Sequence, residues 1–291
     1  MGSSARPPKG GLRLAPAFLL LALTPALAAP DNKRTPAASA ACDLETVASG
    51  TVQSVTDGRT FVLADGQEVR LPAVEIPALP APAPAESTEP PPPPPGADAA
   101  AAAALRALLE GRHVALRASK LVTDRYGRIL ADALASRDGY PASAQKTLLS
   151  QGLAFLASRT PEPGCRAELR AAERIGRAAK LGLWADPRYL PRQADDVAGL
   201  SAERGRFTLV EGKVVSVRES GGTIYMNFGK RWSEDFTVTI LKRNERQFID
   251  AGLRPSGLSG RRVMVRGWIE ERGGPWIEAA GPEQIEIIAE K

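Results

Sequence analysis

A proline-rich segment at residues 79–96, with the sequence LPAPAPAESTEPPPPPPG, sets the first limit on how this chain folds. Proline has no backbone N–H to donate and holds φ near one value, so such a run fits neither a helix interior nor a central strand. The sequence therefore predicts an exposed insertion with folded segments on both sides. It serves as a spacer or as a docking segment for a protein partner that reads proline-rich peptides.

The pattern around this insertion predicts two similar β-rich domains. Strands are expected at 50–55, 59–63, 68–71, 113–116 and 128–135, and helices at 98–109, 142–154 and about 165–180, the first of them capped by Asp98. The second half repeats the plan, with strands at 210–217, 223–228, 236–240, 262–270 and 276–288 and a helix at 244–251. Five strands with a helix between the third and fourth are typical of an OB barrel. We predict a mainly β fold with helices (α+β), consisting of two small five-stranded OB-like barrels in tandem, the first with three helices; a different small barrel is the alternative for the second.

The start of the chain is typical of an export signal. Basic residues precede an apolar run at 14–27, which ends in the small-residue pattern Ala26-Leu27-Ala28. This run is shorter than the roughly 20 apolar residues of a membrane-spanning helix, so we expect no membrane span. The predicted domains are a signal peptide (1–28), a lead (29–45), a first domain (46–187, with the insertion 79–96), a linker (188–204) and a second barrel (205–291). The protein is expected to be exported, either periplasmic or secreted.

The cysteine content and the charge exclude several classes of protein. One histidine and two cysteines are too few for a zinc cluster. In an oxidising compartment Cys42 and Cys165 are expected to form a disulfide, with two buried free thiols as the alternative. The formal net charge of +5 includes three basic residues of the signal, so the remaining chain is nearly balanced. Nucleic-acid binding would therefore depend on local basic patches.

Six short sequence words occur in the order and spacing of a known family. They are VTDGRT at 55–60, VRL at 69–71, DRYGR at 124–128, GLA at 152–154, AAE at 171–173 and GLW at 182–184. Over about residues 46–187 the chain resembles the staphylococcal nuclease (thermonuclease) family. The resemblance implies a five-stranded barrel with three helices and a calcium-dependent hydrolysis of DNA and RNA phosphodiesters. The residues after 187 lie outside the resemblance.

The resemblance implies roles for five residues. Arg70 and Arg128 match the two catalytic arginines of the family, which stabilise charge on the phosphate. Glu75 stands where the family has a calcium-binding aspartate, which makes it the candidate catalytic and metal-binding carboxylate. Arg125 and Tyr126, in the DRYGR word, are candidate ligand-binding residues.

Other family positions carry residues that do not suit the reaction. Arg59 replaces a second calcium-binding aspartate, and a cation there repels a divalent ion. Ala78 replaces the glutamate assigned as general base, and alanine cannot accept a proton. Ser158 and Thr160 take the places of tyrosines that stack on the substrate.

These departures predict a nuclease fold that has lost the family reaction. We expect Arg59, Arg70 and Arg128 to converge on one face and to bind an anionic ligand or nucleic acid, with no cofactor. One alternative is a structural ion network in which Glu75 pairs with Arg59. The other is an active nuclease with a rearranged site that uses Glu75, Arg70 and Arg128, and calcium if the family activity persists.

Aromatic and basic residues alternate in the second domain. The aromatic ones are Tyr225, Phe228, Trp232, Phe236, Trp268 and Trp276. OB surfaces use such residues to stack on single-stranded nucleic acids. The alternative is that most of them belong to the core.

Overall fold

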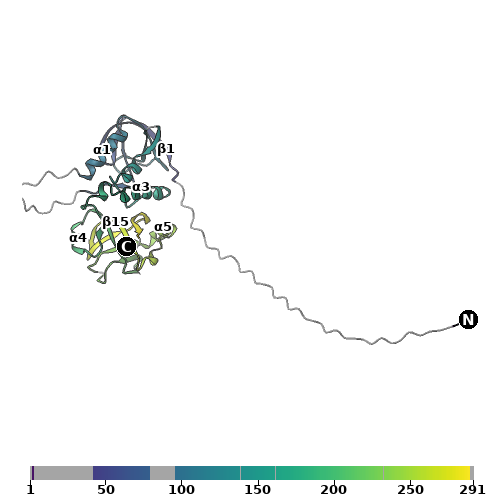
Figure 1. Ribbon diagram of the computed structural model, residues 1–291, viewed down its shortest axis with the longest axis vertical. Helices are drawn as coiled ribbons and strands as arrows, with labels where there is room; N and C mark the ends of the chain where they lie inside the picture. The colour runs from purple at the N-terminus through teal and green to yellow at the C-terminus, as the bar shows by residue number, and fades with distance from the viewer. Residues whose placement is uncertain are drawn as a thin grey trace, which may run out of the picture. The chain divides into compact units, whose positions relative to one another are not determined.

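The computed structural model describes residues 2, 42–78, 96–137, 139–160, 162–231 and 233–288 (Figure 1). The predicted export signal, most of the proline-rich segment and Trp232 lie outside these residues. The described residues from Cys42 onward fall within one compact unit, which combines helices with several sheets. The predicted α+β class is therefore confirmed. None of the helices in the described part is long and apolar enough to cross a membrane.

The first sheet curls so that one stretch of chain pairs near both of its ends. Its strands are β1 (Glu45–Asp57), β2 (Thr60–Leu63), β3 (Glu68–Arg70), β5 (His113–Ala118), β6 (Ile129–Leu130), β7 (Asp132–Arg137) and β8 (Tyr140–Ser143). β6 pairs with β3 in parallel, and β7 pairs with β5 in antiparallel fashion. Only Ala131 separates β6 from β7. Residues 129–137 therefore pair with both β3 and β5, which gives the sheet a barrel-like curvature although the described strands form no closed barrel.

Three helices pack on this sheet, as expected, but one predicted cap is wrong. They are α1 (Ala97–Leu109), α2 (Ala144–Ser150) and α3 (Arg166–Ala178). Asp98 lies inside α1, after the N-cap Gly96, and its Oδ1 accepts a hydrogen bond from Gly58 N at 3.0 Å. A Cβ at residue 58 would lie 2.7 Å from the Cβ of Ala101 in α1, so this close contact needs glycine. The Gly58 N–H binds the carboxylate that the sequence assigned to the cap.

The second half forms two sheets. The four-stranded sheet contains β10 (Arg192–Gln193), β11 (Phe207–Lys213), β15 (Arg262–Trp268) and β18 (Ile285–Ile287). The five-stranded sheet contains β12 (Ser216–Ser220), β13 (Thr223–Asn227), β14 (Thr237–Leu241), β17 (Gly274–Glu278) and β16 (Glu270–Arg272). β11 is antiparallel to β15, and β14 is parallel to β17, which repeats the pairing of β1 with β5 and of β3 with β6.

Short elements complete the described chain. They are the β4 (Val74–Glu75) and β9 (Phe155–Leu156) pair, α4 (Val197–Ala202), α5 (Glu245–Asp250) and the 3₁₀ turns Pro163–Cys165, Gly182–Trp184, Lys242–Asn244, Pro255–Leu258 and Pro282–Gln284. The predicted linker 188–204 contains β10 and α4, and Leu200 is fully buried. We call the described residues 42–187 the N-terminal lobe and those after them the C-terminal lobe.

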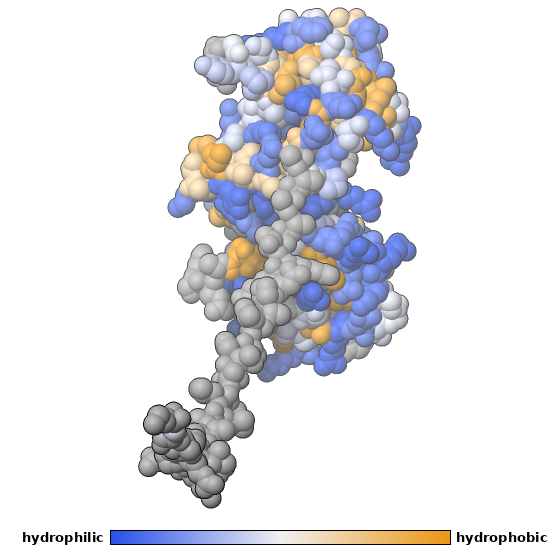
Figure 2. Space-filling view, turned by 90° about the vertical axis from the view of Figure 1, so that its right-hand side faces the viewer, coloured by the Kyte–Doolittle hydropathy of each residue, from blue (hydrophilic) through white to orange (hydrophobic). Residues whose placement is uncertain are grey.

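Each lobe has its own hydrophobic core, and a third cluster joins them. Phe61 and Leu116 are central in the first core, and Phe236 and Val265 in the second. The joining cluster consists of Phe155, Leu183, Trp184, Tyr189, Phe207, Leu209 and Met264. On the face shown in Figure 2, hydrophilic residues predominate and hydrophobic ones gather in separate patches. The three apolar clusters are buried within and between the lobes.

The GLA and GLW sequence words mark a close backbone contact. Gly152 and Gly182 have φ angles of +67° and +51°, and a Cβ at Gly182 would lie 2.4 Å from the Gly152 carbonyl oxygen. Gly176 of α3 is equally tight, since its Cβ would lie 2.6 Å from the carbonyl oxygen of Leu149 at the end of α2. Glycine is required at these places because two backbones touch there.

The predicted disulfide between Cys42 and Cys165 is present, with the two Cα atoms 4.2 Å apart. It links the chain just before β1 to the residue that precedes α3. The bond therefore ties the first sheet to the helix that contacts the C-terminal lobe.

Candidate functional site

Arg59 and Glu75 form a half-buried ion pair at the predicted metal position. Arg59 lies in the turn between β1 and β2, where its backbone N donates to Asp57 Oδ1 at 2.8 Å. Its Nη1 donates to Glu75 Oε2 at 2.7 Å and to the Val74 carbonyl oxygen at 3.1 Å. The side chain of Glu75 is only 12% exposed. The carboxylate that the resemblance assigned to calcium is therefore neutralised by the arginine that replaces a family aspartate, as in the ion-network alternative.

Arg70 lies at the end of β3, opposite Thr60 of β2. Its Nη1 donates to Thr60 Oγ1 at 3.1 Å, and no described carboxylate forms an ion pair with it. Burial lowers the pKa of Arg70, and the nearby charges of Arg59 and Arg128 lower it further. The guanidinium stays charged at neutral pH, because the ordinary pKa of arginine lies far above neutral pH. The charges of Arg59 and Arg128 thus both act on Arg70 and disfavour its own positive charge.

The DRYGR word folds into a tight turn that orients Arg128. Asp124 Oδ1 accepts hydrogen bonds from the backbone N of Tyr126 and of Arg128. Asp124 Oδ2 accepts from Arg128 Nε at 2.8 Å and lies 2.6 Å from its Nη2. The hydrogen bond to Asp124 is the main cause that raises the pKa of Arg128. Asp124 is therefore the positioning residue of Arg128.

Tyr126 stands between two arginines on the surface of this turn. Its side chain is 66% exposed. The guanidinium carbons of Arg125 and Arg128 lie 4.8 and 5.0 Å from its ring centre, and Arg125 Nη2 donates to its hydroxyl at 2.6 Å. Such cation–π contacts hold the side chains together while leaving the ring open to a ligand. The predicted ligand-binding residues Arg125 and Tyr126 thus lie beside Arg128.

The residues at this site do not fit a calcium ion. Calcium takes six to eight oxygen ligands. Within the described ranges no three His, Cys, Asp or Glu side chains gather in a way that could hold a metal. Glu75 is already bound to Arg59, whose charge opposes a divalent cation. Ala78 contributes only backbone atoms, and its carbonyl oxygen accepts from Arg206 Nη2 at 3.4 Å.

The positions of the expected stacking tyrosines lie under the C-terminal lobe. Thr160 is 7% exposed, and its backbone N donates to Glu283 Oε1 at 2.8 Å. Ser158 is half-buried. Neither residue can stack on a base, so the stacking surface implied for the family is missing from this part of the described structure.

The face of α3 that contacts the C-terminal lobe was missed by the sequence analysis. Arg166, Arg170, Glu173 and Arg177 recur at intervals of four, three and four, which places them on one side of the helix. Arg166 Nε lies 3.1 Å from Glu283 Oε2, Arg170 Nη2 donates to the carbonyl of Glu283, and Arg177 pairs with Glu286 at 2.7 Å. Helical spacing of charges was the available signal. Its meaning appears only when the partner residues, about a hundred positions later, are in place.

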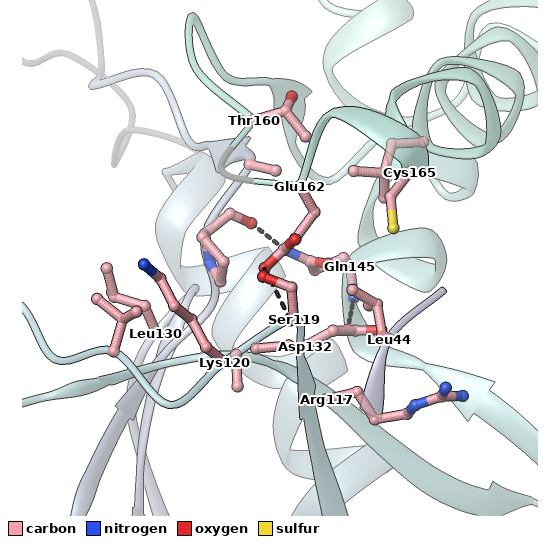
Figure 3. A pocket seen from close by; sticks show the side chains of 16 residues that line it. Leu44, Arg117, Ser119, Lys120, Leu130, Asp132, Gln145, Thr160, Glu162 and Cys165 are labelled. Atoms are coloured by element: carbon pink, nitrogen blue, oxygen red, sulfur yellow. Dashed lines mark hydrogen bonds between the residues drawn. The ribbon is translucent and has the colours of Figure 1, made fainter. Parts of the chain in front are cut away.

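A second pocket is lined by none of the three clustered arginines (Figure 3). It encloses about 110 Å³ next to Cys165, and Asp132 and Gln145 line it. Gln145 N donates to Asp132 Oδ1 at 3.2 Å, and Glu162 accepts from the Ser119 hydroxyl at 2.9 Å. Burial raises the pKa of Asp132. No residue predicted to act on a phosphate lines this pocket.

The comparisons with known proteins agree with the sequence words and the geometry. Residues 81–186 match the family model of staphylococcal nuclease homologues. This range includes Arg125, Tyr126 and Arg128 and begins after Arg59, Arg70 and Glu75. A comparison with curated proteins found no match. Over residues 81–186 the chain is therefore similar to staphylococcal nuclease homologues.

Proposed function

We propose that this protein binds a phosphate-bearing ligand, such as a nucleic acid, at Arg59, Arg70 and Arg128, without calcium and without cleaving it. The observation that carries the proposal is the 2.7 Å pair between Arg59 and Glu75. This pair places a cation at the family's metal position and engages the one carboxylate that the resemblance left there. It favours an anion over a divalent cation at the same place.

Arg70 is the main candidate to hold the anion. Arg59 and Arg128 each have a carboxylate partner, whereas Arg70 hydrogen-bonds to the hydroxyl of Thr60. Its lowered pKa reflects burial and the two neighbouring guanidinium groups. A phosphate placed beside Arg70 would relieve this repulsion and could accept two parallel hydrogen bonds from the guanidinium. Tyr126 and Arg125 would extend the contact to a base or sugar.

Hydrolysis requires groups that are engaged or replaced here. A general base must reach the attacking water with a free lone pair, and Glu75 Oε2 accepts from Arg59. Ala78 stands at the position of the family's general base. Without a base or a metal, the arginines can bind and polarise a phosphate but do not activate a nucleophile.

Binding and cleavage can be tested on the same protein. We expect fluorescence anisotropy with a labelled, denatured DNA oligonucleotide in EDTA to show binding that Arg70→Ala weakens at least tenfold. Arg106→Ala, an exposed arginine on α1, is the matched control and should bind like the wild type. With calcium, calorimetry should show no binding heat and a nuclease assay no cleavage. Calcium-dependent cleavage that Glu75→Gln and Arg128→Ala each abolish would overturn the proposal in favour of the rearranged nuclease.

We also propose that the protein is exported and that its proline-rich segment docks a protein partner. The signal-like residues 1–28 and the disulfide between Cys42 and Cys165 support export. N-terminal sequencing of protein from a bacterial periplasmic fraction should begin at Ala29. Deletion of residues 79–96 should remove a pull-down interaction while leaving oligonucleotide binding intact. Cytoplasmic protein that keeps Met1, or an unchanged pull-down, would contradict the respective proposal.

A further inference from the structure

An open groove on the C-terminal lobe shares no residue with the arginine cluster. It has a volume of about 330 Å³ and is lined by Ser216, Arg218, Ser220, Tyr225, Asn227 and Lys230, together with Gly229. Alternate residues of β12 and of β13 line it, because successive side chains of a strand point to opposite faces. The lining is therefore one face of the β12–β13 hairpin together with Gly229 and Lys230, which follow β13 in the chain. Its volume lies at the lower end of the roughly 300–1,000 Å³ that small-molecule sites span.

The groove is positively charged. Arg218 and Lys230 line it, and no carboxylate does. The neighbouring acids are directed elsewhere: Glu219 pairs with Lys242 at 2.5 Å and Glu234 with Arg231 at 2.8 Å. Arg218 and Lys230 form none of the ion pairs found between described residues. The guanidinium of Arg218 and the ammonium of Lys230, which line the same groove, are suited to bind phosphate groups.

Tyr225 supplies an aromatic surface between these charges. It is 37% exposed and lies directly opposite Arg218 in the β12–β13 register. Most other aromatic residues of this lobe are core: Phe228 and Phe236 pack 5.0 Å apart, and Trp276 is 4% exposed beneath Arg272. Exposed Trp268 lies on β15, in the other sheet. Tyr225 is thus the aromatic ring that faces the groove.

Polar groups in the groove suit the edge of a base or a sugar. Asn227 Nδ2 donates to Ser216 Oγ at 3.2 Å, so the amide and the hydroxyl hold each other in place across the two strands. Ser220 is the last residue of β12 and is exposed to solvent. Ordered hydroxyl and amide groups beside an exposed ring give both stacking and hydrogen bonds to one ligand.

We infer that this groove binds one nucleotide of a single-stranded nucleic acid, with its base stacked on Tyr225 and the flanking phosphates on Arg218 and Lys230. The site stands on different residues from the arginine cluster, so either can exist without the other. A bare phosphate would contact only the two cations and would make no stacking contact with the Tyr225 ring. A single strand contacts both the cations and the ring, and it is therefore the ligand that fits the whole lining.

The inference can be tested with a single-stranded oligonucleotide that carries fluorescein and one 5-bromouracil. We expect Tyr225→Ala to weaken binding of this oligonucleotide about 5- to 100-fold, whereas Tyr225→Phe, which keeps the ring, binds like the wild type. Arg218→Ala/Lys230→Ala should reduce the slope of log K against log salt by about 1.4, since each phosphate contact on a single strand contributes about 0.7. Arg246→Ala, 91% exposed and outside the groove, is the matched loss of charge and should change little. Irradiation should attach the bromouracil to Tyr225.

The outcomes separate this site from the arginine cluster. Retained affinity and a Tyr225 adduct in Arg70→Ala/Arg128→Ala would support the groove whatever becomes of the proposed function. An Arg70→Ala/Arg128→Ala protein that neither binds the oligonucleotide nor forms the adduct would overturn the groove and leave the arginine cluster as the binding site. Unchanged affinity in Tyr225→Ala and in Arg218→Ala/Lys230→Ala would overturn it as well. Binding of mononucleotides without strands would point to a free nucleotide and also contradict the inference.

Discussion

Glu173 and Arg266 form a fully buried ion pair between the two lobes. Their side chains are 0% and 1% exposed, and two parallel contacts of 2.7 and 2.8 Å join them. Leu156 N donates to Glu173 Oε1, and Arg266 Nη1 donates to the carbonyl of Leu156. The pair is thus satisfied on both sides by the backbone of β9. Such pairs add little net stability, but they make the loss of one partner severe.

Removing one member of this pair should strongly destabilise the protein. Arg266→Met leaves the Glu173 carboxylate buried without its counterion, and the expected loss in the free energy of unfolding is about 3–5 kcal/mol. Urea unfolding followed by circular dichroism measures it. Arg246→Ala, which loses only an exposed pair with Asp250, should cost less than about 1 kcal/mol. The double variant Glu173→Leu/Arg266→Met should lose less than Arg266→Met alone, and equal or larger losses would contradict a mainly electrostatic cause.

Asp132 should make stability fall as the pH rises. Burial raises its pKa above 3.8, although hydrogen bonds from Ser143 and the backbone N of Gln145 act against this shift. The folded state therefore holds the proton more tightly than the unfolded state, and its relative stability declines as the pH climbs from about 3.8 through the folded pKa. Asp132→Asn removes this effect, because an amide can accept the same hydrogen bond from Gln145 N.

The corresponding measurement is the melting temperature between pH 3 and pH 7. The advantage of Asp132→Asn over the wild type should grow with pH across this window. Asp65→Asn, in an exposed turn where Asp65 Oδ1 accepts from Gln67 N, is the control and should show no such growth. A wild type that gains stability relative to Asp132→Asn as the pH rises would show that Asp132 is stabilised as a carboxylate.

At the scale of elements, the contact between α2 and α3 depends on Gly176. Alanine is normally favoured over glycine inside a helix by about 1 kcal/mol. At residue 176 a Cβ would lie 2.6 Å from the Leu149 carbonyl oxygen and 2.9 Å from Gly152 N, and neither backbone atom can turn away. Gly176→Ala should therefore lower the free energy of unfolding by about 1–3 kcal/mol. Gly257→Ala, where no atom lies within 4 Å, is the matched control in thermal melts. Equal melting temperatures of Gly176→Ala and Gly257→Ala would mean that α2 and α3 can move apart without loss of stability.

Elements were predictable from the sequence where the signal is local. The helices at α1 and α3 and the Gly221-Gly222 turn before β13 were predicted from local periodicity and glycines, whereas the strand predicted at 210–217 is divided between β11 and β12. Asp98 was misassigned as a cap because its true partner, Gly58 N, lies on the other side of the proline-rich segment. The charged face of α3 has a visible spacing, but its acids and Arg266 follow about a hundred residues later. Long-range pairing is the part that local patterns do not encode.

In the candidate site, too, the contacts between distant residues could not be predicted from local sequence patterns. The convergence of Arg70 and Arg128 was inferred from the resemblance, since the spacing of the words gives no distances. The position of Arg59 beside Glu75 was open between an anion pocket and an ion network, and the structure contains the ion pair. The pairing of Asp124 with Arg128 was not predicted, because it depends on the turn that the DRYGR word adopts.

At the scale of the whole molecule, the disulfide should contribute strongly to stability. Cys42 and Cys165 are 123 residues apart, and closing so long a loop in the unfolded chain lowers its entropy by an amount equivalent to about 5 kcal/mol. Cys42→Ala/Cys165→Ala should unfold at a correspondingly lower urea concentration. Dithiothreitol should lower the midpoint of the wild type and leave that of the double variant unchanged. A wild type that is insensitive to full reduction would contradict this expectation.

The position of α3 has a consequence for how this protein can evolve. One side of the helix belongs to the core of the N-terminal lobe, through Leu169 and Ala172, and the other carries the arginines and Glu173 that meet Arg266, Glu283 and Glu286. A recombination event that exchanged the C-terminal lobe for an unrelated domain would leave Glu173 without a counterion and would expose the joining apolar cluster. The two lobes are therefore expected to be exchanged or lost together in evolution, since each supplies the counterions and apolar partners of the other.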